Sequence, residues 1–475
     1  MHADTEAHPR QQTRQPWTIL VLLAVAQFMV ILDVTVVNVA LPSIGADLGF
    51  AAGDLQWVVS AYVLFTGGLL LLGGRAADML GRRRVFLAGM TLFTLASLAS
   101  ALAESPGMLI GSRAAQGLGA AMLSPAALSI VTATYSGSQR TAALSAWGAI
   151  GAGGAVVGMV LGGMLTSWLS WEWVFFINVP IGLAAVPLTL RLVKPVVGEG
   201  GLRQLDVLGA LTLVGGLVTL VYTIEETSTH GWDSARTLIG LALSALLLAG
   251  FVAVERAAQR PMIPPSTWRI RSLTSGVGMM LGATGILVGV LFLSSLYVQH
   301  ELGWSALETG LAFLPLTLTI APVAHLAPHA LSAFGTKRVL TSGLILMAAG
   351  AGWLAAAPDR ATYASDLLPG LLVMGVGLGL VFVTVQVTGM SEVRERTAGL
   401  ASGLMTTGHE IGAALGVAVF SAVATGTGGL TALGSPSGYG DGLTVAALVA
   451  LGLAGLAAAT VPAIRPPRAA HVGMH

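Results

Sequence analysis

The chain lacks cysteine and has few charged residues. None of its 475 residues is Cys, and Asp, Glu, Lys and Arg together make up 9% of the chain. The missing cysteine excludes disulfides, thiolate metal sites, cysteine nucleophiles and prenylation. A soluble globular protein carries roughly 25% charged residues, so this chain has too few of them to cover a water-soluble surface. We therefore expect a membrane protein.

The sequence also lacks basic runs and catalytic motifs, and their absence excludes further classes of function. The formal net charge is only +1, and no Lys/Arg-rich run with interleaved aromatic residues is present, which argues against a nucleic-acid partner. The sequence has no GxxxxGK[ST] loop for ATP, and no GxSxG, HExxH or Cys/His metal set. We therefore expect neither an enzyme nor a protein with a bound metal or cofactor.

Long apolar stretches dominate what is present. A membrane-spanning helix needs about 20 mostly apolar residues, and hydrophobic residues make up 55% of the chain. Fourteen stretches meet this requirement. They lie near residues 17–40, 55–73, 85–103, 107–132, 142–166, 172–192, 206–224, 236–254, 273–296, 307–328, 338–357, 366–389, 398–422 and 443–463. The sequence therefore predicts an all-α polytopic membrane protein with fourteen spans.

The basic residues test this number of spans, because cytoplasmic loops hold the excess of Lys and Arg. With fourteen spans, both termini lie on one side of the membrane. If that side is the cytoplasm, every Lys and Arg except three falls in a cytoplasmic segment; Arg236 and Arg360 lie outside, and Arg113 lies within a span. We therefore expect a multi-pass protein of the inner (cytoplasmic) membrane with both termini in the cytoplasm.

A short repeat divides the chain. The sequence LGRRRV at 80–85 precedes the third span, and FGTKRV at 334–339 precedes the eleventh. In the same way, QGLG at 116–119 in the fourth span is echoed by MGVG at 374–377 in the twelfth. Each pair is eight spans apart, which indicates two six-helix halves in parallel orientation. Transporters with parallel repeats of this kind hold the substrate between the halves.

The repeat predicts the organisation of the chain. Two six-helix bundles would comprise 17–192 and 273–463. A linker with two additional transmembrane helices would occupy 193–272, and cytoplasmic tails would occupy 1–16 and 464–475.

Five segments resemble the signatures of a known family. They are LDVTVVNVALP at 32–42, GGRAADMLGRRR at 73–84, RAAQG at 113–117, the glycine-rich stretch 148–163, and WEWVFFINVP at 171–180. Together they resemble the fourteen-span drug:proton antiporters of the major facilitator superfamily. The resemblance implies a major facilitator fold and export of lipophilic, cationic drugs or antibiotics by alternating access. The proton gradient would supply the energy, and a monomer would suffice.

The chain departs from the family's pattern at three places. Met159 follows Gly158 where the family commonly has Pro, and Glu172 stands where Arg is common. In the thirteenth span, His409 and Glu410 replace an Arg-Gln pair.

Four side chains within the expected spans are candidates for proton coupling. A carboxylate inside a membrane is costly and usually functional, which selects Asp33. Arg113 lies at a similar depth, roughly 10 Å from the outer end of its span at 1.5 Å per residue, so the two could face each other. Glu410 lies near mid-membrane, beside His409, which can titrate near neutrality. The alternative is a purely structural role for each.

The remaining candidates follow from the resemblance and from single polar or aromatic residues in spans. The segment 73–84 implies a gate loop with Gly74, Asp78, Gly81, Arg82 and Arg83, in which glycines allow a tight turn. The fifth-span glycines would give close helix packing alone, or a sliding antiporter interface. These glycines are Gly151, Gly154, Gly158 and Gly162. Possible substrate-binding residues are Gln27, Phe28, Asn38, Trp57, Tyr62, Gln116, Tyr297, Gln299 and Gln386.

Alternatives remain within transport and outside it. The chain could be a dedicated exporter of a single self-made antibiotic or metabolite, or an importer. Outside transport, it could be an intramembrane enzyme or a membrane sensor. Sensitivity of flux to a protonophore distinguishes a proton-driven exporter from the non-transport alternatives.

Overall fold

The computed structural model describes residues 17–50, 54–135, 137–195, 206–258, 261–394, 397–426 and 435–461. Within these residues every regular element is helical, which confirms the predicted all-α fold. The N-bundle comprises α1 (Trp17–Leu48), α2 (Trp57–Leu80), α3 (Arg82–Ala101), α4 (Pro106–Thr134), α5 (Gly137–Trp168), α6 (Trp173–Phe176) and α7 (Asn178–Leu192). The C-bundle comprises α10 (Arg271–His300), α11 (Ala306–Phe334), α12 (Thr336–Ala355), α13 (Leu368–Met390), α14 (Ala398–Gly426) and α15 (Pro436–Thr460).

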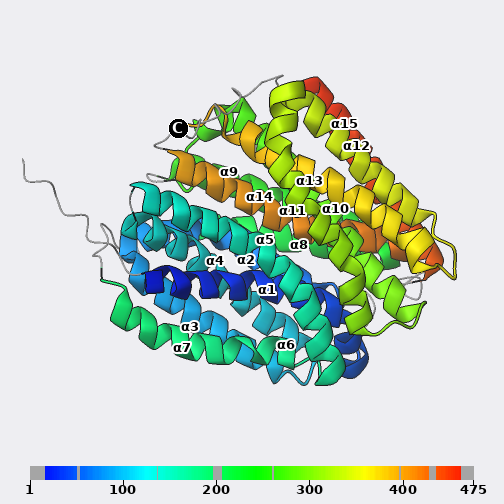
Figure 1. Cartoon of the computed structure of the whole chain (residues 1–475), viewed down its shortest axis with the longest axis horizontal. Coiled ribbons are helices and arrows are strands. Elements are labelled where there is room, and N and C mark those ends of the chain that lie inside the picture. Colours follow the sequence, from blue (N-terminus) through cyan, green and yellow to red (C-terminus); the bar gives the residue numbers. More distant parts are fainter. Residues whose placement is uncertain are drawn as a thin grey trace, which may run out of the picture.

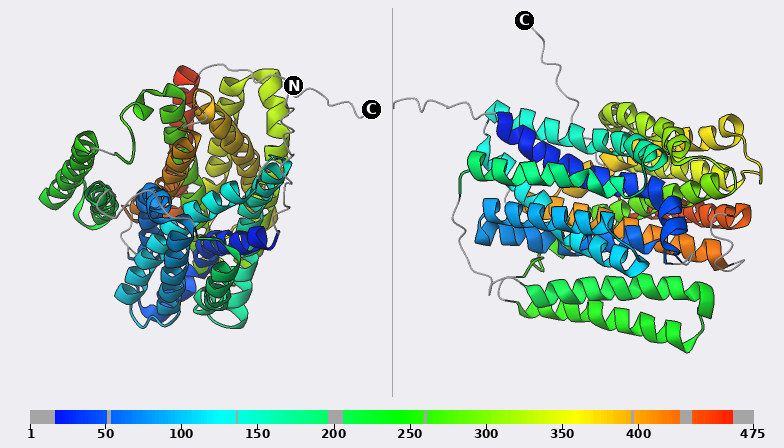
Figure 2. Two further views of the ribbon diagram at one scale, coloured as in Figure 1. Left: turned by 90° about the vertical axis from the view of Figure 1, so that its left-hand side faces the viewer. Right: turned by 90° about the horizontal axis from the view of Figure 1, so that it is seen from below.

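Between the bundles the chain forms a hairpin of two helices, α8 (Val207–His230) and α9 (Ala235–Ala257). Helix α8 packs against α2 and α14, whereas α9 packs mainly against α8. Figure 1 shows the two bundles side by side, and Figure 2 shows the hairpin at the edge of the molecule. The hairpin therefore adds two helices without entering the space between the bundles.

Thirteen helical segments in the described part of the chain are long and apolar enough to cross a membrane. One of them, Trp173–Leu192, consists of α6 and α7. The remaining predicted span falls on α5, a helix of 32 residues in which Val157–Trp168 is an apolar segment.

The two bundles repeat one packing pattern. Gly81 ends α2 with φ +97°, and Gly335 ends α11 with φ +81°; only glycine adopts such angles without strain. A Cβ on Gly89 would lie 2.8 Å from the carbonyl oxygen of Gly119, and a Cβ on Gly343 would lie 3.1 Å from that of Gly377. In each bundle, glycines therefore let the third and fourth helices approach backbone to backbone.

The segment 73–84 is not the loop that we expected. Helix α2 continues to Leu80, and the chain breaks only at Gly81 before α3 begins at Arg82. A Cβ on Gly73 would lie 2.0 Å from the carbonyl oxygen of Ala121 in α4. Gly73 therefore serves close helix packing, and Gly81 alone makes the turn.

We name the end of the molecule that carries Gly81 and Gly335 the inner end, and the opposite end the outer end. At the outer end α5 meets α11. The Leu307 amide donates to Ser167 Oγ at 3.1 Å, and a Cβ on Gly310 would lie 2.4 Å from the Met159 carbonyl oxygen. This contact between the bundles therefore has no room for a side chain at position 310.

A second contact at the outer end joins α1 to α10. Ser295 Oγ donates to the Asn38 carbonyl oxygen at 3.1 Å, and Gln299 Nε2 donates to the Val39 carbonyl oxygen at 3.2 Å. Pro42 lies inside α1 and has no N–H, so the carbonyl of residue 38 lacks its usual helical donor. That free carbonyl is available to the other bundle. We call the α5–α11 and α1–α10 contacts together the outer seam.

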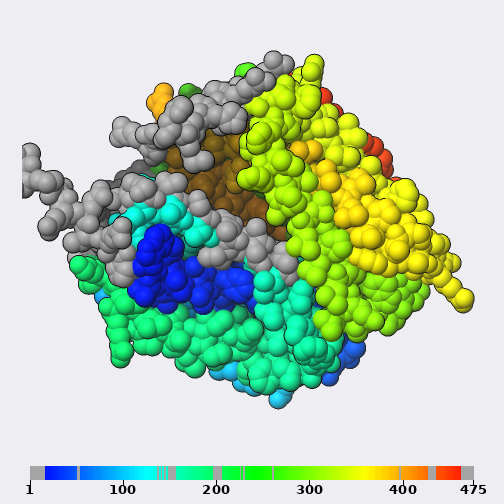
Figure 3. All heavy atoms as spheres, viewed as in Figure 1, coloured from blue at the N-terminus to red at the C-terminus, as the bar shows by residue number. Residues whose placement is uncertain are grey.

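The bundles separate toward the inner end. Leu326 and Phe334 in the inner half of α11 are exposed. Figure 3 shows a hollow between α11 and the N-bundle, with atoms of α14 at its floor. The molecule is therefore closed at its outer end and open at its inner end.

Candidate functional site

A buried polar cluster surrounds Asp33 in the N-bundle. The Asp33 side chain is 0% exposed and that of Arg113 is 1% exposed. Arg113 Nη1 donates to Asp33 Oδ2 at 2.5 Å. Gln116 Nε2 and Asn178 Nδ2 donate to Asp33 Oδ1 at 2.7 and 3.1 Å. One carboxylate thus joins α1 to α4 and α7, and Asp33 does face Arg113.

A backbone carbonyl and neutral side chains complete the hydrogen bonds of the cluster. Arg113 also donates to the Val58 carbonyl oxygen at 2.9 Å and to Gln116 Oε1 at 2.8 Å. Ser97 Oγ of α3 accepts hydrogen bonds from Gln116 at 3.2 Å and from Asn178 at 2.9 Å. Since both charges are fully buried, losing either Asp33 or Arg113 would leave the other unpaired, which is strongly destabilising.

Aromatic rings cover the guanidinium of Arg113. The Tyr62 ring lies 4.3 Å from the Arg113 Cζ, and the Phe175 ring lies 5.6 Å away. Such contacts stabilise a desolvated cation by about 2 kcal/mol. Tyr62 and Gln116, which we expected to line a substrate cavity, are instead buried parts of the Asp33 cluster.

Asn178 and Ser97 are not among the residues that the sequence predicts for this cluster. Asn178 lies at the start of α7, in the segment 171–180 that carried part of the family resemblance. An amide or a hydroxyl in an otherwise apolar span was the signal available. It did not indicate which way either side chain points.

Glu410 and His409 lie near the middle of α14, and Glu410 is on the side that meets α2. A Cβ on Gly67 of α2 would lie 2.5 Å from Glu410 Cβ, so Glu410 sits between the bundles with 18% of its side chain exposed. His409 is 42% exposed, and its Nδ1 lies 3.6 Å from Glu410 Oε1. The His409 ring is 6.2 Å from Phe382 of α13. The two side chains therefore lie in different directions, toward α2 and toward α13.

Some of the other expected substrate-binding residues are at least partly exposed, whereas others belong to the outer seam. Gln27 and Phe28 on α1 and Trp57 on α2 are half-buried, and Gln386 on α13 is exposed. Gln27 Oε1 is buried, with no hydrogen-bond donor in the described part of the chain. Asn38 Nδ2 donates to its own helix, to Val34. The carbonyl of Asn38 and the side chain of Gln299 belong to the outer seam, so neither lines a cavity here.

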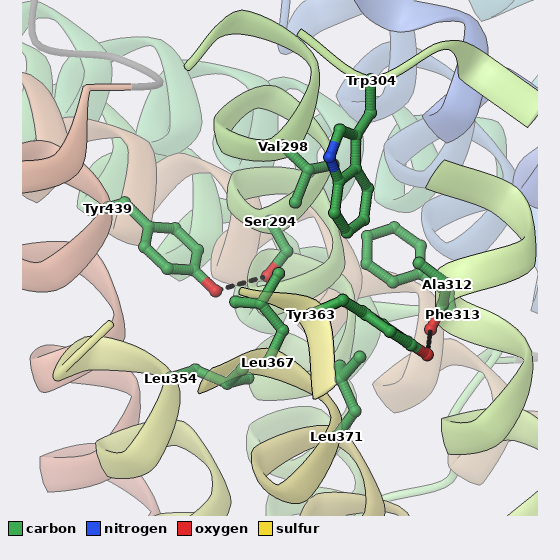
Figure 4. Close-up of a pocket in the computed structure, with 10 residues that line it drawn as sticks. All are labelled: Ser294, Val298, Trp304, Ala312, Phe313, Leu354, Tyr363, Leu367, Leu371 and Tyr439. Carbon is green, nitrogen blue, oxygen red and sulfur yellow. Dashed lines mark hydrogen bonds between the residues drawn. The ribbon is translucent and has the colours of Figure 1, made fainter. Parts of the chain in front are cut away.

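Tyr297 does not line a central cavity either. Its ring stacks on Tyr439 with centroids 4.2 Å apart, and its hydroxyl donates to the Pro358 carbonyl oxygen at 2.8 Å. Tyr439 lines a small apolar pocket inside the C-bundle with Ser294, Tyr363 and Leu371 (Figure 4). This cavity of about 10 Å³ has room for no more than about one water. It therefore cannot hold a drug.

The arginines that follow Gly81 tie the inner end of the N-bundle together. Arg82 Nε lies 3.9 Å from Asp78 Oδ1, but Asp78 is 69% exposed, so this ion pair contributes little stability. Arg83 donates to the Leu190 carbonyl oxygen at 2.8 Å, and Arg75 donates to the Pro261 carbonyl oxygen at 3.2 Å. Gly74 has only ordinary contact, with Pro125. The turn thus contacts α7, and the last part of α2 contacts the segment that follows α9.

The fifth-span glycines face α1. A Cβ on Gly154 would lie 3.0 Å from Ile31, one on Gly158 would lie 1.8 Å from Thr35 Oγ1, and one on Gly162 would lie 2.9 Å from Val36. The surroundings of Gly151 lie outside the described residues. Since Met159 faces α11, helix α5 touches α1 of its own bundle and α11 of the other.

Comparison with known proteins agrees with this architecture. The sequence model of the Major Facilitator Superfamily matches residues 23–417. The cephamycin export protein CmcT of Amycolatopsis lactamdurans is 40% identical over 88% of this chain and 86% of its own length. The puromycin resistance protein pur8 of Streptomyces alboniger is 39% identical over 87% and 82% of the two chains.

A solved structure shares the fold. The crystal structure of an auto inhibited POT family peptide transporter has a TM-score of 0.69 at 16% identity, and the match covers 96% of this chain and 99% of that one. The match at this identity concerns the fold alone. Together with the sequence match, it establishes that the chain belongs to the major facilitator superfamily and is a multi-pass membrane transporter rather than an enzyme.

Proposed function

We propose that this protein is a proton-coupled antiporter that exports lipophilic drugs or antibiotics. The observation that carries the proposal is the buried carboxylate of Asp33, held by Arg113 inside the membrane-spanning part of the N-bundle. A protein seldom keeps an ionised pair at this depth unless the pair has a function. The similar proteins named for antibiotic export and resistance support the choice of substrate.

The open inner end and closed outer seam correspond to the state that loads substrate. The inner end would face the cytoplasm of a cell-membrane protein with both termini in the cytoplasm, because the Lys and Arg residues concentrate there. Substrate would enter the hollow beside α11 and meet His409 and Gln386. One chain contains every group that this cycle needs, so we propose a monomer as the functional unit.

Protonation of Asp33 would act through α1. A neutral carboxyl no longer attracts Arg113, so α1 would be held less firmly against α4. Asn38 lies five residues further along the same helix, about 7.5 Å along its axis, and its carbonyl accepts the hydrogen bond from Ser295 of the C-bundle. A shift of α1 would therefore be transmitted to the outer seam, so the proton on Asp33 would control the exchange between the inward-open and outward-open states.

The proposed coupling is tested by efflux of a fluorescent lipophilic cation in inverted membrane vesicles. We expect accumulation when a pH gradient is imposed, and collapse of the transport on adding a protonophore. Transport that is indifferent to the protonophore would overturn proton coupling. If only one antibiotic among many is transported, the chain is a dedicated exporter, an alternative that the single-antibiotic name of the cephamycin exporter supports.

Glu410→Gln is expected to separate cationic from neutral substrates. The carboxylate lies between the bundles and is 18% exposed, so it can attract a cation that enters the hollow. At an effective dielectric constant of 20, two opposite charges 4 Å apart attract by about 4 kcal/mol, and screening would leave a loss of about tenfold in apparent affinity for cations. Neutral substrates should change little.

The control for this variant is His409→Gln, which leaves the carboxylate in place. Apparent KM values for a cationic and a neutral substrate, measured in the same vesicles, give the comparison. Equal losses for both substrates in Glu410→Gln would assign Glu410 to proton coupling or to packing against Gly67 instead.

A further inference from the structure

A cavity of about 600 Å³ lies beside the α8–α9 hairpin at its inner end, apart from the space between the bundles. Its walls come from the last turns of α9 and from the segment that leads to α10, which includes the 3-10 turn η2 (Thr267–Arg269). The lining residues are Phe251, Val252, Glu255, Arg256, Ile263, Pro265, Trp268 and Arg269. Cavities of roughly 300–1,000 Å³ are typical of small-molecule sites.

The polar groups of this cavity are mostly cationic. Arg256 and Arg269 are exposed, and within the described residues neither has an ion-pair partner. Glu255 is buried, and its two carboxylate oxygens accept hydrogen bonds from the amides of Met262 and Ile263 at 3.0 and 2.9 Å. The one acid of the cavity wall is thus bound to the backbone, with Asp206 beside it, while both guanidinium groups remain available to a ligand.

The position of the cavity exposes it to lipid. Helix α9 packs mainly against α8, and its apolar side chains Leu243 and Leu246 are exposed. Arg256 lies in the last turn of α9, where a membrane helix reaches the headgroup region. Trp268, at 52% exposure, is of the residue type that prefers this interface. Phe251 and Ile263 form an apolar part of the cavity wall.

We propose that this cavity binds the headgroup of an anionic phospholipid. The phosphodiester oxygens would accept hydrogen bonds from Arg256 and Arg269, since guanidinium groups bind phosphate in a bidentate way. The acyl chains would lie along Val252 and the exposed face of α9. Basic pockets at the cytoplasmic ends of membrane helices bind acidic lipid headgroups by this chemistry.

The bound lipid would also affect the inner end of the N-bundle. The wall segment begins beside Pro261, whose carbonyl accepts a hydrogen bond from Arg75 near the end of α2. Ordering this segment would strengthen the contact between the hairpin and the helix that leads into the Gly81 turn. Transport should therefore depend on the content of anionic lipid, as well as on the gradient.

The binding test uses the purified, delipidated full-length protein. Native mass spectrometry would measure retention of phosphatidylglycerol and of phosphatidylcholine with identical acyl chains. We expect phosphatidylglycerol to be preferred, and the double variant Arg256→Gln/Arg269→Gln to lose about tenfold in affinity for it. Arg256→Lys/Arg269→Lys should retain part of the affinity, because charge remains and the planar fork is lost.

A matched control removes two positive charges elsewhere at the inner end. Arg191 and Lys194 are exposed at the end of α7, and Arg191→Gln/Lys194→Gln should leave the binding unchanged. Equal losses in the two Gln double variants would show a non-specific surface effect and overturn the proposal. So would equal binding of the two lipids, or full displacement by millimolar inorganic phosphate, which would indicate a phosphate site.

A further variant tests the same cavity independently, in case the arginine double variant does not fold. Val252→Trp fills the cavity and leaves both arginines in place, so it should also weaken phosphatidylglycerol binding. Unchanged binding in this variant would overturn the proposed location. None of these binding measurements depends on the proposed drug efflux, which can fail without affecting them.

Discussion

Asp33→Asn is expected to reduce proton-driven transport to background. The amide is similar in shape to the carboxylate but cannot take up a proton, and it leaves Arg113 as an uncompensated charge in the core of the N-bundle. Removing one partner of a buried ion pair costs about 3–5 kcal/mol. We therefore expect a loss of stability of this size together with the loss of transport.

These two losses are separated by a second variant. In Asp33→Asn/Arg113→Gln the cluster is neutral, so the stability should largely return, while transport should not. Thermal unfolding in detergent and gradient-driven uptake in vesicles provide the two readouts. If the double variant transports as well as the wild type, the pair is a structural element, and Glu410 becomes the first candidate for the proton site.

Gly310→Leu is expected to hold the transporter open at its outer end. A Cβ at this position already lies 2.4 Å from the Met159 carbonyl oxygen, so a leucine must push α11 away from α5. Overpacking of this kind costs about 1–3 kcal/mol, and each 1.4 kcal/mol changes a population ratio tenfold. The outward-open state should therefore gain about tenfold or more, and transport should fall to a small fraction of the wild-type rate.

The absence of cysteine makes this shift measurable. A single cysteine introduced by Gln386→Cys lies in the last turns of α13 near the inner end, where it can be labelled with a membrane-impermeant maleimide from the inner side of the membrane. This labelling should fall in Gly310→Leu. Gly278→Leu is the control, because nothing lies within 4 Å of a Cβ at that position. Unchanged labelling in Gly310→Leu would mean that the outer seam does not control access.

The fold could be predicted from the sequence because span length and charge distribution depend on the bilayer. The contact between Asp33 and Arg113 could also be predicted, since the rise per residue gives the depth of each side chain in its span. The contacts of Asn178 and Ser97 were not. These contacts depend on how each helix is rotated about its axis, and a helix that is apolar on all faces carries no periodic signal for that rotation.

The same limit explains the residues assigned to the wrong environment. Tyr62, Gln116 and Tyr297 are polar or aromatic residues in spans, and each is buried within one bundle instead of facing the space between them. The glycines at 73–74 were interpreted as turn residues. A glycine that admits a neighbouring helix, as Gly73 admits α4, cannot be distinguished by sequence from one that makes a turn.

The repeat is symmetric in packing and asymmetric in charge. In the register that aligns QGLG at 116–119 with MGVG at 374–377, Arg113 corresponds to Leu371. Arg113 is bound to Asp33 in the N-bundle, whereas Leu371 lines the small apolar pocket of the C-bundle (Figure 4). The proposed proton chemistry therefore has no counterpart in the second half at this position.

With Asp33 ionised, its pair with Arg113 carries no net charge. With Asp33 protonated, the cluster carries one positive charge, which belongs to Arg113. If that proton enters from outside and leaves to the cytoplasm, each cycle carries one positive charge inward. One elementary charge crossing 100 mV corresponds to about 2.3 kcal/mol. Export of an uncharged drug would therefore be electrogenic, and an inside-negative membrane voltage would drive it even without a pH difference.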